Sequence, residues 1–491
     1  MIVKDDKEIL QSYLKDASNF QGNADAVYIP SDLQELTEII SDFYQEKKPF
    51  TISGAGTGLT GGRVPSEGVI ISMERFNKIL EIDYNQRLAR VQSGVTLLEL
   101  EEELKSKGYF FPPNPTEKNS SIGGNIANNA SGSRTFKYGA YRYFVNELKV
   151  VLANGDILVL DEKSKTLKNN EITLVAHSGN IYKIPIDFLN LPDTKNAAGY
   201  YMVQGMRDID LFIGSEGTLG VIAEVVLKIL PEPEQVVGFM TFFENVDKML
   251  NYVENIRNLS LINNKSDYRQ VRGISARLIE LFDKNALDLV RDKYPQIPKE
   301  AIACIWTEQE LNAVNEDAVL NSWFSLIKDY TDLANDTWVS MNDIENDKFR
   351  EFRHSIPLKV VDTVAKNGFQ KFGTDTAVPV DKFTEFYTFV VDKFNDSSLD
   401  YAIWGHIGNA HLHANLLPKT NKEFEKSKEI INLILSEAIR LKGTVSAEHG
   451  IGKLKKEFLP LMFGQKGVEA MKLVKNVLDP YYLLGRGNLF D

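Results

Sequence analysis

The sequence predicts an α+β protein of more than one domain, in which the character of the first part reappears at the end. About the first 230 residues mix short strands, helices and glycine-rich loops, until two prolines interrupt the pattern in "ILPEPEQ", 229–235. Longer charged helical segments follow to about residue 440, and the earlier pattern returns after Gly443 in "GTVSAEHGIGKLKKE". We therefore expect domains at 1–233 and 234–443 and a C-terminal segment at 444–491.

Length and composition are those of a soluble globular protein. A chain of 491 residues is too long for one hydrophobic core, so two or three domains are expected. The net charge of −12 argues against a nucleic-acid partner, which would require a basic face. The single cysteine, Cys304, excludes an internal disulfide and a four-cysteine metal site, and it fits a reducing compartment.

The N-terminal twenty residues have no apolar core of the signal-peptide type. No run of 18 apolar residues follows anywhere, so no transmembrane helix is expected. These features indicate a cytoplasmic location, with peripheral attachment to the inner face of a membrane left open.

Local signals place several elements of the first domain. Ser31, with Gln34 three residues later, is expected to cap a helix that precedes the strand "PFTIS". Thr96 and Glu99 form the same pattern at the start of a second helix. The dipeptide at 154–155, Asn-Gly, predicts a hairpin turn in "LKVVLANGDILVL".

Three glycine-rich loops indicate a binding site for an anionic ligand. The first, "TISGAGTGLTGG" at 51–62, lacks the third glycine of a dinucleotide fingerprint, since Leu59 stands there, and no helix follows. Its bare backbone N–H groups would suit an anion nest, although a simple β-turn is the alternative. "SIGGNIANNASGSRTFKYG" and "FIGSEGTLGVI" are the other two loops. Together they suit a ligand with a pyrophosphate and an extended ring system.

Histidine is concentrated in one short stretch. "GHIGNAHLHANLLP", 405–418, holds three of the six histidines of the chain. It reads as a strand ending at His406, a turn, and a second strand with His411 and His413 on one face. Downstream, "SAEHG" adds Glu448. Two histidines and a glutamate leave positions open on a metal ion, the pattern of a catalytic metal site, whereas a polar surface loop is the alternative.

Taken in order, these motifs resemble those of FAD-linked oxidoreductases of the vanillyl-alcohol oxidase and para-cresol methylhydroxylase (PCMH) type. Within that family they are most similar to the branch with D-lactate dehydrogenase, the glycolate oxidase flavoprotein subunit and D-2-hydroxyglutarate dehydrogenase. The resemblance extends from about residue 20 to residue 491. It implies an α+β fold with a two-subdomain, PCMH-type FAD-binding domain that is split in sequence. An α+β cap (substrate) domain is inserted, and a helical C-terminal segment returns to the FAD domain.

The resemblance also implies which residues bind FAD. The loop 53–60 would hold the pyrophosphate, the second loop would line the pyrophosphate and flavin, and the third would close the far side. The set is Ser53, Gly54, Ala55, Gly56, Thr57, Gly58, Leu59, Thr60, Ser120, Gly123, Gly124, Asn125, Asn129, Gly132, Glu216, Gly217, Ile222 and Asn488. Members with covalent flavin carry a histidine where Thr57 stands, so we expect FAD to be bound non-covalently.

For the metal, the resemblance implies His406, His413 and Glu448 as ligands. Zinc is the leading ion, with manganese, iron and cobalt as alternatives. The family pattern "GDGNLH" is "GNAHLH" here, so His411 stands where a substrate-contacting amide is expected. In the tail, "LGRGNLF" replaces "LNPGKIF", which puts Arg486 and Asn488 at the proline and lysine positions.

Catalytic roles follow from the same comparison. His449 would take the hydroxyl proton as general base. Arg353, in "FREFRHSIP", would clamp the substrate carboxylate, whereas Arg350 is expected to face solvent. Gly373 stands at the position of a lysine that binds longer diacids in the family, and Lys371 lies two residues before it.

The implied activity is FAD- and metal-dependent oxidation of a D-2-hydroxy acid to the 2-oxo acid by hydride transfer to flavin. D-lactate is the leading substrate, and D-2-hydroxyglutarate and glycolate are alternatives. Electrons would pass to an external acceptor, namely a quinone, a cytochrome or an electron-transfer flavoprotein. A non-redox flavin transferase like alkylglycerone-phosphate synthase is the alternative from another class, but that class lacks the histidine and glutamate set. A non-catalytic electron-transfer subunit is a third alternative, and a homodimer is left open.

Overall fold

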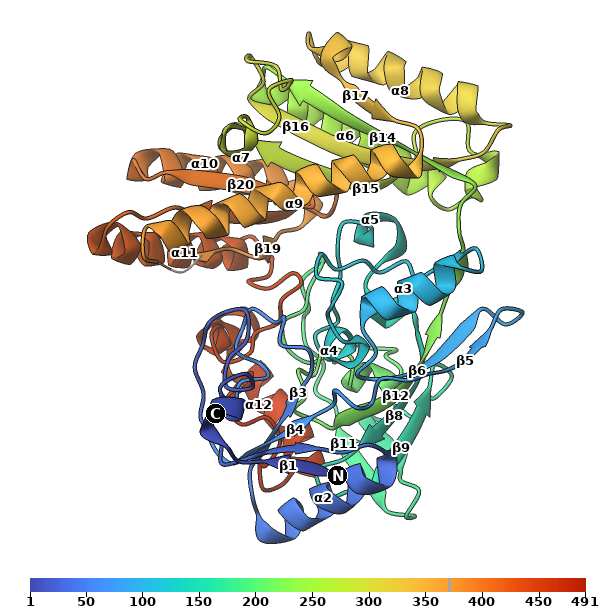
Figure 1. The fold of residues 1–491 in the computed structure, drawn as a ribbon, viewed down its shortest axis with the longest axis vertical. Coiled ribbons are helices and arrows are strands. Elements are labelled where there is room, and N and C mark those ends of the chain that lie inside the picture. The colour runs from blue at the N-terminus through green and yellow to red at the C-terminus, as the bar shows by residue number, and fades with distance from the viewer. Residues whose placement is uncertain (370–371) are drawn as a thin grey trace.

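The structure is a computed structural model that describes residues 1–369 and 372–491, and it confirms the α+β class (Figure 1). The predicted residue Lys371 lies outside the described residues. One lobe contains the smaller sheets and both termini, and a second lobe contains the largest sheet and its helices (Figure 1). Among the described helices, none combines the length and apolar character needed to span a bilayer.

The first small sheet has four strands in the order β1-β2-β4-β3, and the pairs β2–β4 and β3–β4 are parallel. Its elements are β1 (Ile2–Lys4), α1 (Lys7–Leu10), β2 (Val27–Ile29), α2 (Leu33–Glu46), β3 (Phe50–Ser53) and β4 (Val69–Ser72). Helix α2 has its apolar residues at helical spacing and buries Leu36, Ile40 and Phe43 in the core that it shares with β3 and β4.

The second sheet has five antiparallel strands in the order β5-β6-β12-β8-β9. Its strands are β5 (Ile79–Asp83), β6 (Leu88–Gln92), β8 (Val145–Val151), β9 (Ile157–Asp161) and β12 (Val221–Lys228). The same lobe contains α3 (Leu97–Lys105), β7 (Tyr109–Phe110), α4 (Ile122–Ala127), α5 (Thr135–Tyr138), the hairpin β10 (Glu171–Val175) and β11 (Ile181–Pro185), and β13 (Leu230–Pro231). Between these strands run the second and third glycine loops.

Two of the local predictions for this lobe are confirmed, and one is wrong by one residue. The Thr96–Glu99 capping box is present, and the chain turns between β8 and β9 with Gly155 at φ +88°. The cap of α2 is Asp32, not Ser31, because the Asp32 carboxylate accepts the backbone N–H of Glu35 at 2.9 Å. The reciprocal partner is Glu35 rather than Gln34, since its side chain accepts from the backbone N–H of Ser31 at 2.8 Å.

The second lobe is built on an eight-stranded sheet in the order β17-β14-β16-β15-β20-β21-β18, with β19 paired to β21 off this path. Its strands are β14 (Gln235–Phe243), β15 (Ala276–Asp283), β16 (Ala303–Leu311), β17 (Trp338–Ser340), β18 (Phe372–Gly373), β19 (Thr376–Ala377), β20 (Tyr401–Gly405) and β21 (His411–Leu416). Its helices are α6 (Val246–Asn263), α7 (Lys284–Val290), α8 (Glu316–Tyr330), α9 (Asp343–Lys366), α10 (Phe383–Ser397) and α11 (Asn421–Arg440).

The C-terminal segment crosses back to the first lobe, as the split fold implies. Its first residues run beside β19, where the N–H of Thr444 donates to the carbonyl of Ala377 at 2.8 Å. Helix α12 (Leu459–Leu478) then packs in the lobe of the small sheets (Figure 1). Near the chain end, Leu484 bridges in parallel to Phe50 of β3. The segment 444–450 therefore lies between the two lobes.

Candidate active site

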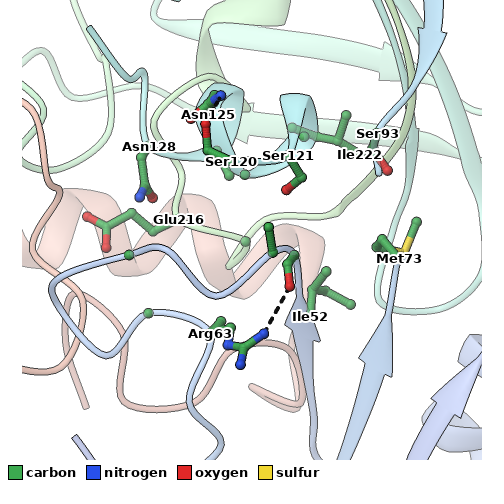
Figure 2. Close-up of a pocket in the computed structure, with 18 of the residues that line it drawn as sticks. Ile52, Arg63, Met73, Ser93, Ser120, Ser121, Asn125, Asn128, Glu216 and Ile222 are labelled. Atoms are coloured by element: carbon green, nitrogen blue, oxygen red, sulfur yellow. Dashed lines mark hydrogen bonds between the residues drawn. The ribbon is translucent and has the colours of Figure 1, made fainter. Parts of the chain in front are cut away.

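The three glycine loops converge on one pocket, which is partly open to solvent. In Figure 2, Arg63 and Ile52 lie on one side of it, and Ser120, Ser121 and Asn125 lie across from them at α4. The predicted residues that line it are Gly54, Ala55, Gly56, Thr57, Gly58, Thr60, Ser120, Gly123, Gly124, Asn125, Glu216, Gly217 and Ile222.

Close packing explains why two of these positions are glycine. A Cβ on Gly123 would lie 2.6 Å from the Cβ of Ser93, and a Cβ on Gly54 would lie 2.6 Å from the Oγ of Ser121. Larger residues would force the loops apart, and Gly56 also has φ +80°, which L side chains rarely adopt. The loops therefore present bare backbone to the pocket, which suits a pyrophosphate.

Other predicted cofactor residues lie outside the lining of this pocket. These are Ser53, Leu59, Asn129, Gly132 and Asn488. Asn488 lies directly behind the pocket, because its amide donates to the carbonyl oxygens of Gly62 at 2.7 Å and Glu216 at 3.2 Å. Glycine at 132 lets two backbone segments approach each other closely, since a Cβ there would lie 2.1 Å from the carbonyl oxygen of Asn114.

Glu216 connects the pocket to the C-terminal segment. Its carboxylate accepts the backbone N–H groups of Ile451 at 2.7 Å and Gly452 at 2.6 Å. Burial raises the pKa of Glu216 to about 7, although these two hydrogen bonds act in the opposite direction. The side chain, which Figure 2 shows at the pocket, thus fixes the segment that follows Glu448 and His449 against the pocket wall.

The histidine hairpin forms as predicted, with β20 and β21 joined by a short turn at 407–409. The buried Arg257 of α6 fixes this turn by donating to the carbonyl oxygens of Ile407 at 2.7 Å and Gly408 at 3.2 Å. The hairpin brings together His406, His411 and His413, and the C-terminal segment adds Glu448. Each of the four offers one potential ligand atom, and these atoms all lie within 4.8 Å of one another.

Neighbouring acceptors orient two of the rings. The Nδ1 of His406 is hydrogen-bonded to Glu280, and the Nδ1 of His413 lies 3.4 Å from the carbonyl oxygen of Thr374. Carboxylate and carbonyl oxygens only accept hydrogen bonds, so each Nδ1 carries a proton. The nitrogen that can bind a metal through its lone pair is then Nε2. Both Nε2 atoms approach the Glu448 carboxylate, at 3.2 Å from His406 and 3.8 Å from His413.

A positively charged side chain, Lys195, already interacts with these four candidate ligands. The ammonium group of Lys195 donates to Glu448 and lies 3.5 Å from the Nδ1 of His411. Burial alone would raise the pKa of Glu448, but Lys195 and His406 hold it well below its usual range. Burial and the nearby ammonium of Lys195 lower the pKa of His411 to about 4, so its ring is neutral. The residues therefore fit a divalent cation, because imidazole nitrogens and an ionised carboxylate meet at a position where a cation is stabilised.

His449 lies between this cluster and the first glycine loop. Its ring stacks on that of His413, with centroids 5.6 Å apart, and its carbonyl accepts from the Oγ of Thr60 at 3.3 Å. Its Nδ1 lies 3.3 Å from the buried carboxylate of Asp375, which also accepts the backbone N–H of His449 at 2.9 Å. A carboxylate at Nδ1 orients the ring and makes Nε2 the nitrogen that can take a proton, the arrangement that a general base requires.

Arg353 lies on α9 beside a second cavity, which His406 also lines. Its Nε donates to Glu280 at 3.1 Å, so Glu280 holds both Arg353 and His406. Arg350, which was expected to face solvent, is 34% exposed and also lines this cavity. It lies one helical turn before Arg353, on the same side of α9.

The comparisons with known proteins agree with this architecture. A model described as "FAD binding domain" matches residues 24–161, and one described as "FAD linked oxidases, C-terminal domain" matches residues 262–489. The chain is 30% identical over 489 residues to the glycolate oxidase subunit GlcD of Bacillus subtilis, with 97% of this chain and 92% of that protein covered. The chain belongs to the FAD-linked oxidase family.

Other relatives carry the names of the predicted branch. The chain is 27% identical to a D-lactate dehydrogenase of Anaerostipes hadrus, with 98% of this chain and 93% of that protein covered. It is also 27% identical to a D-2-hydroxyglutarate dehydrogenase of Xanthomonas citri, with 95% and 89% covered. A solved alkyldihydroxyacetonephosphate synthase shares the fold, with a TM-score of 0.67 at 16% identity over 98% of this chain and 81% of that one. The predicted family and branch are confirmed, and the protein binds FAD.

Membership of the FAD-linked oxidase family does not by itself identify every residue that shapes the site. Sequence analysis missed Asp375, Lys195 and Glu280, which contact the predicted histidines and Glu448. Asp375 follows Gly373 by two residues in "FGTDTAVP", and Lys195 lies in the glycine-containing loop "TKNAAGY". Each residue is therefore close to a glycine that indicates a loop. Glu280 is an acidic residue inside the apolar strand "ARLIELFD", a buried charge that needs a partner.

As an FAD-linked oxidase with Thr57 in its pocket, the protein should release its FAD completely on denaturation. Thr57 offers no ring nitrogen for a bond to the flavin, and no histidine is among the described residues that line the pocket. Acid precipitation followed by absorbance spectra of the pellet and supernatant measures this. Yellow colour that stays with the washed pellet would contradict non-covalent binding.

Proposed function

We propose that this protein oxidises a D-2-hydroxy acid to the 2-oxo acid and passes the electrons from FAD to an external acceptor. D-lactate is the best candidate, and D-2-hydroxyglutarate and glycolate are alternatives, because relatives of this chain are named for these three substrates. The observation that carries the proposal is the position of His406, His413 and Glu448 next to His449, whose backbone contacts the first FAD loop. The acceptor would be a quinone, a cytochrome or an electron-transfer flavoprotein.

In this proposal each part of the chain has one task. Residues 1–233 and 444–491 hold FAD, and residues 234–443 form the domain that covers the substrate. His406, His413 and Glu448 would hold a divalent cation, which would supply Lewis-acid polarisation of the substrate oxygens. FAD supplies the acceptor for the hydride from Cα. A cytoplasmic protein would then reach a membrane acceptor only by peripheral contact.

The remaining chemistry belongs to side chains. Nε2 of His449 takes the hydroxyl proton, while Asp375 keeps the ring oriented through Nδ1. Arg353 pairs with the substrate carboxylate at the cavity that it shares with His406. Glu280 contacts both the guanidinium and the His406 ring, so the carboxylate-binding group and the candidate metal ligand keep one spacing.

The test is anaerobic reduction of the bound flavin by a panel of hydroxy acids. We expect D-lactate, or one of the alternatives, to bleach the flavin absorbance within one turnover, and L-lactate to leave it oxidised. No bleaching by any 2-hydroxy acid would reject the proposal. It would favour a non-redox flavin transferase, which at present only the shared fold supports.

Replacing Arg353 with lysine should weaken substrate binding and turnover while FAD content stays the same. A bidentate, charge-assisted contact becomes a point charge, which costs on the order of 2 kcal/mol, or about 30-fold in kcat/KM. Arg350→Lys is the matched control, because Arg350 lines the same cavity one turn away. If both variants lose the same amount, the total charge of the cavity matters rather than Arg353, and unchanged kinetics would remove Arg353 from the site.

A further inference from the structure

His411 is the residue that distinguishes this cluster from the expected set of two histidines and a glutamate. It begins β21 and is completely buried, with 0% of its surface exposed. Its ring centroid lies 4.5 Å from that of His413 and 5.2 Å from that of His406. A side chain that replaced an amide only to contact substrate would lie toward an open cavity, whereas this ring is packed among the other candidate ligands.

The surroundings of His411 fix which nitrogen carries its proton. Nε2 lies 3.0 Å from one carboxylate oxygen of Asp375. The other oxygen of Asp375 accepts from the Oγ of Ser446 at 3.0 Å and from the backbone N–H of His449 at 2.9 Å, so this carboxylate is held as an acceptor. Nε2 of His411 must therefore donate, and the lone pair is on Nδ1.

Nδ1 of His411 points toward the same cation position as Glu448. Its partner there is the ammonium of Lys195 at 3.5 Å, and that ammonium also donates to Glu448. His406, His411 and His413 thus share one arrangement, in which an acceptor holds the outer nitrogen and the inner nitrogen is available to a metal. Carboxylate- or carbonyl-held imidazole is the usual environment of a metal-ligating histidine.

We propose that His411 is a fourth metal ligand, so that the site is made of three histidines and Glu448. This inference rests on the proposed function, since it assumes the metal site. Four protein donors would fill a four-coordinate zinc ion and leave no place for substrate. A substrate that binds through its hydroxyl and carboxylate oxygens needs two further positions. The site therefore fits a six-coordinate ion, Mn²⁺, Fe²⁺ or Co²⁺, better than Zn²⁺.

The test is metal binding to the metal-free, FAD-loaded protein, measured separately with Mn²⁺ and Zn²⁺ by equilibrium dialysis. We compare wild type with His411→Asn, which restores the amide of the family pattern, and with His177→Asn, an exposed histidine outside the cluster, as the control. His411→Asn should weaken Mn²⁺ binding by at least about tenfold, and Zn²⁺ binding by less, because three ligands still suit zinc. The control should bind both ions as wild type does.

The outcomes distinguish a failure of the fourth ligand from a failure of the metal site itself. Equal Mn²⁺ affinity in wild type and His411→Asn, with a raised KM for substrate, would overturn the fourth ligand and leave the three-residue site intact. Absence of metal binding in wild type would overturn the metal site itself. If His411→Asn does not fold, pulsed electron paramagnetic resonance of Mn²⁺-loaded wild type counts the coordinated imidazoles. Three supports the proposal, and two contradicts it.

Discussion

His449→Ala is expected to reduce the rate of flavin reduction by roughly 10²–10⁴-fold while metal and FAD content stay at the wild-type level. The substitution removes the proton acceptor and leaves the candidate metal ligands in place. Stopped-flow reduction under anaerobic conditions measures the loss, and metal analysis of the same sample measures the site. His177→Ala, an exposed histidine, should react like wild type.

Added imidazole provides a sharper criterion for this role. A small base that diffuses into the space left by the ring should restore part of the rate of His449→Ala and none of the rate of His413→Ala. A His449→Ala variant with near wild-type reduction would mean that another group takes the proton. In that case Asp375, which contacts His449 and His411, would be the next residue to test.

Glu448→Ala is expected to lose most of the bound metal and with it nearly all turnover, without loss of flavin. Its removal takes away the only carboxylate among the four candidate ligands and leaves the buried ammonium of Lys195, 4% exposed, without its partner. An unpaired buried cation repels a second cation. Glu448→Gln, which keeps the shape and removes the charge, should lose metal to a similar extent. Elemental analysis after dialysis gives the metal content per chain, which should be about one in wild type.

His413→Ala is the informative comparison for Glu448→Ala. His406, His411 and Glu448 remain in that variant, so it should retain more metal than Glu448→Ala does. Chelation of the wild type should abolish turnover without releasing or bleaching the flavin. Full activity in metal-free wild type would contradict metal dependence, and the histidines would then serve substrate binding alone.

The parts of the site that could be predicted are those with a local pattern. Glycine spacing in three loops indicated the FAD pocket, and the alternation of His411 and His413 along a strand indicated a shared face. These features depend on neighbours within a few residues of one another, where backbone geometry is the same in many folds. The predicted cap of α2 was wrong by one residue, because Ser31 and Asp32 are both good cap residues and a local pattern does not distinguish them.

The parts that could not be predicted depend on contacts over long sequence separations. Asp375 matters because β19 and the segment after Gly443 bring it against His411 and His449. Lys195 comes from a loop of the first lobe, 253 residues before Glu448. A single lysine or aspartate carries no spacing signal, so only the fold identifies its partner. Arg350 likewise could not be placed, since its exposure depends on what covers α9.

The pairing of Phe50 with Leu484 has a consequence for synthesis on the ribosome. The backbone N–H of Phe50 donates to the carbonyl of Leu483 at 2.9 Å, and both leucines belong to the same buried apolar cluster as Phe50. At roughly 5–20 residues per second, β3 waits on the order of 20–90 s for this edge partner. During that time an unpaired strand edge and an unfilled core are open to other chains. Truncations that remove Leu483 and Leu484 should therefore reduce soluble yield through aggregation of the nascent protein.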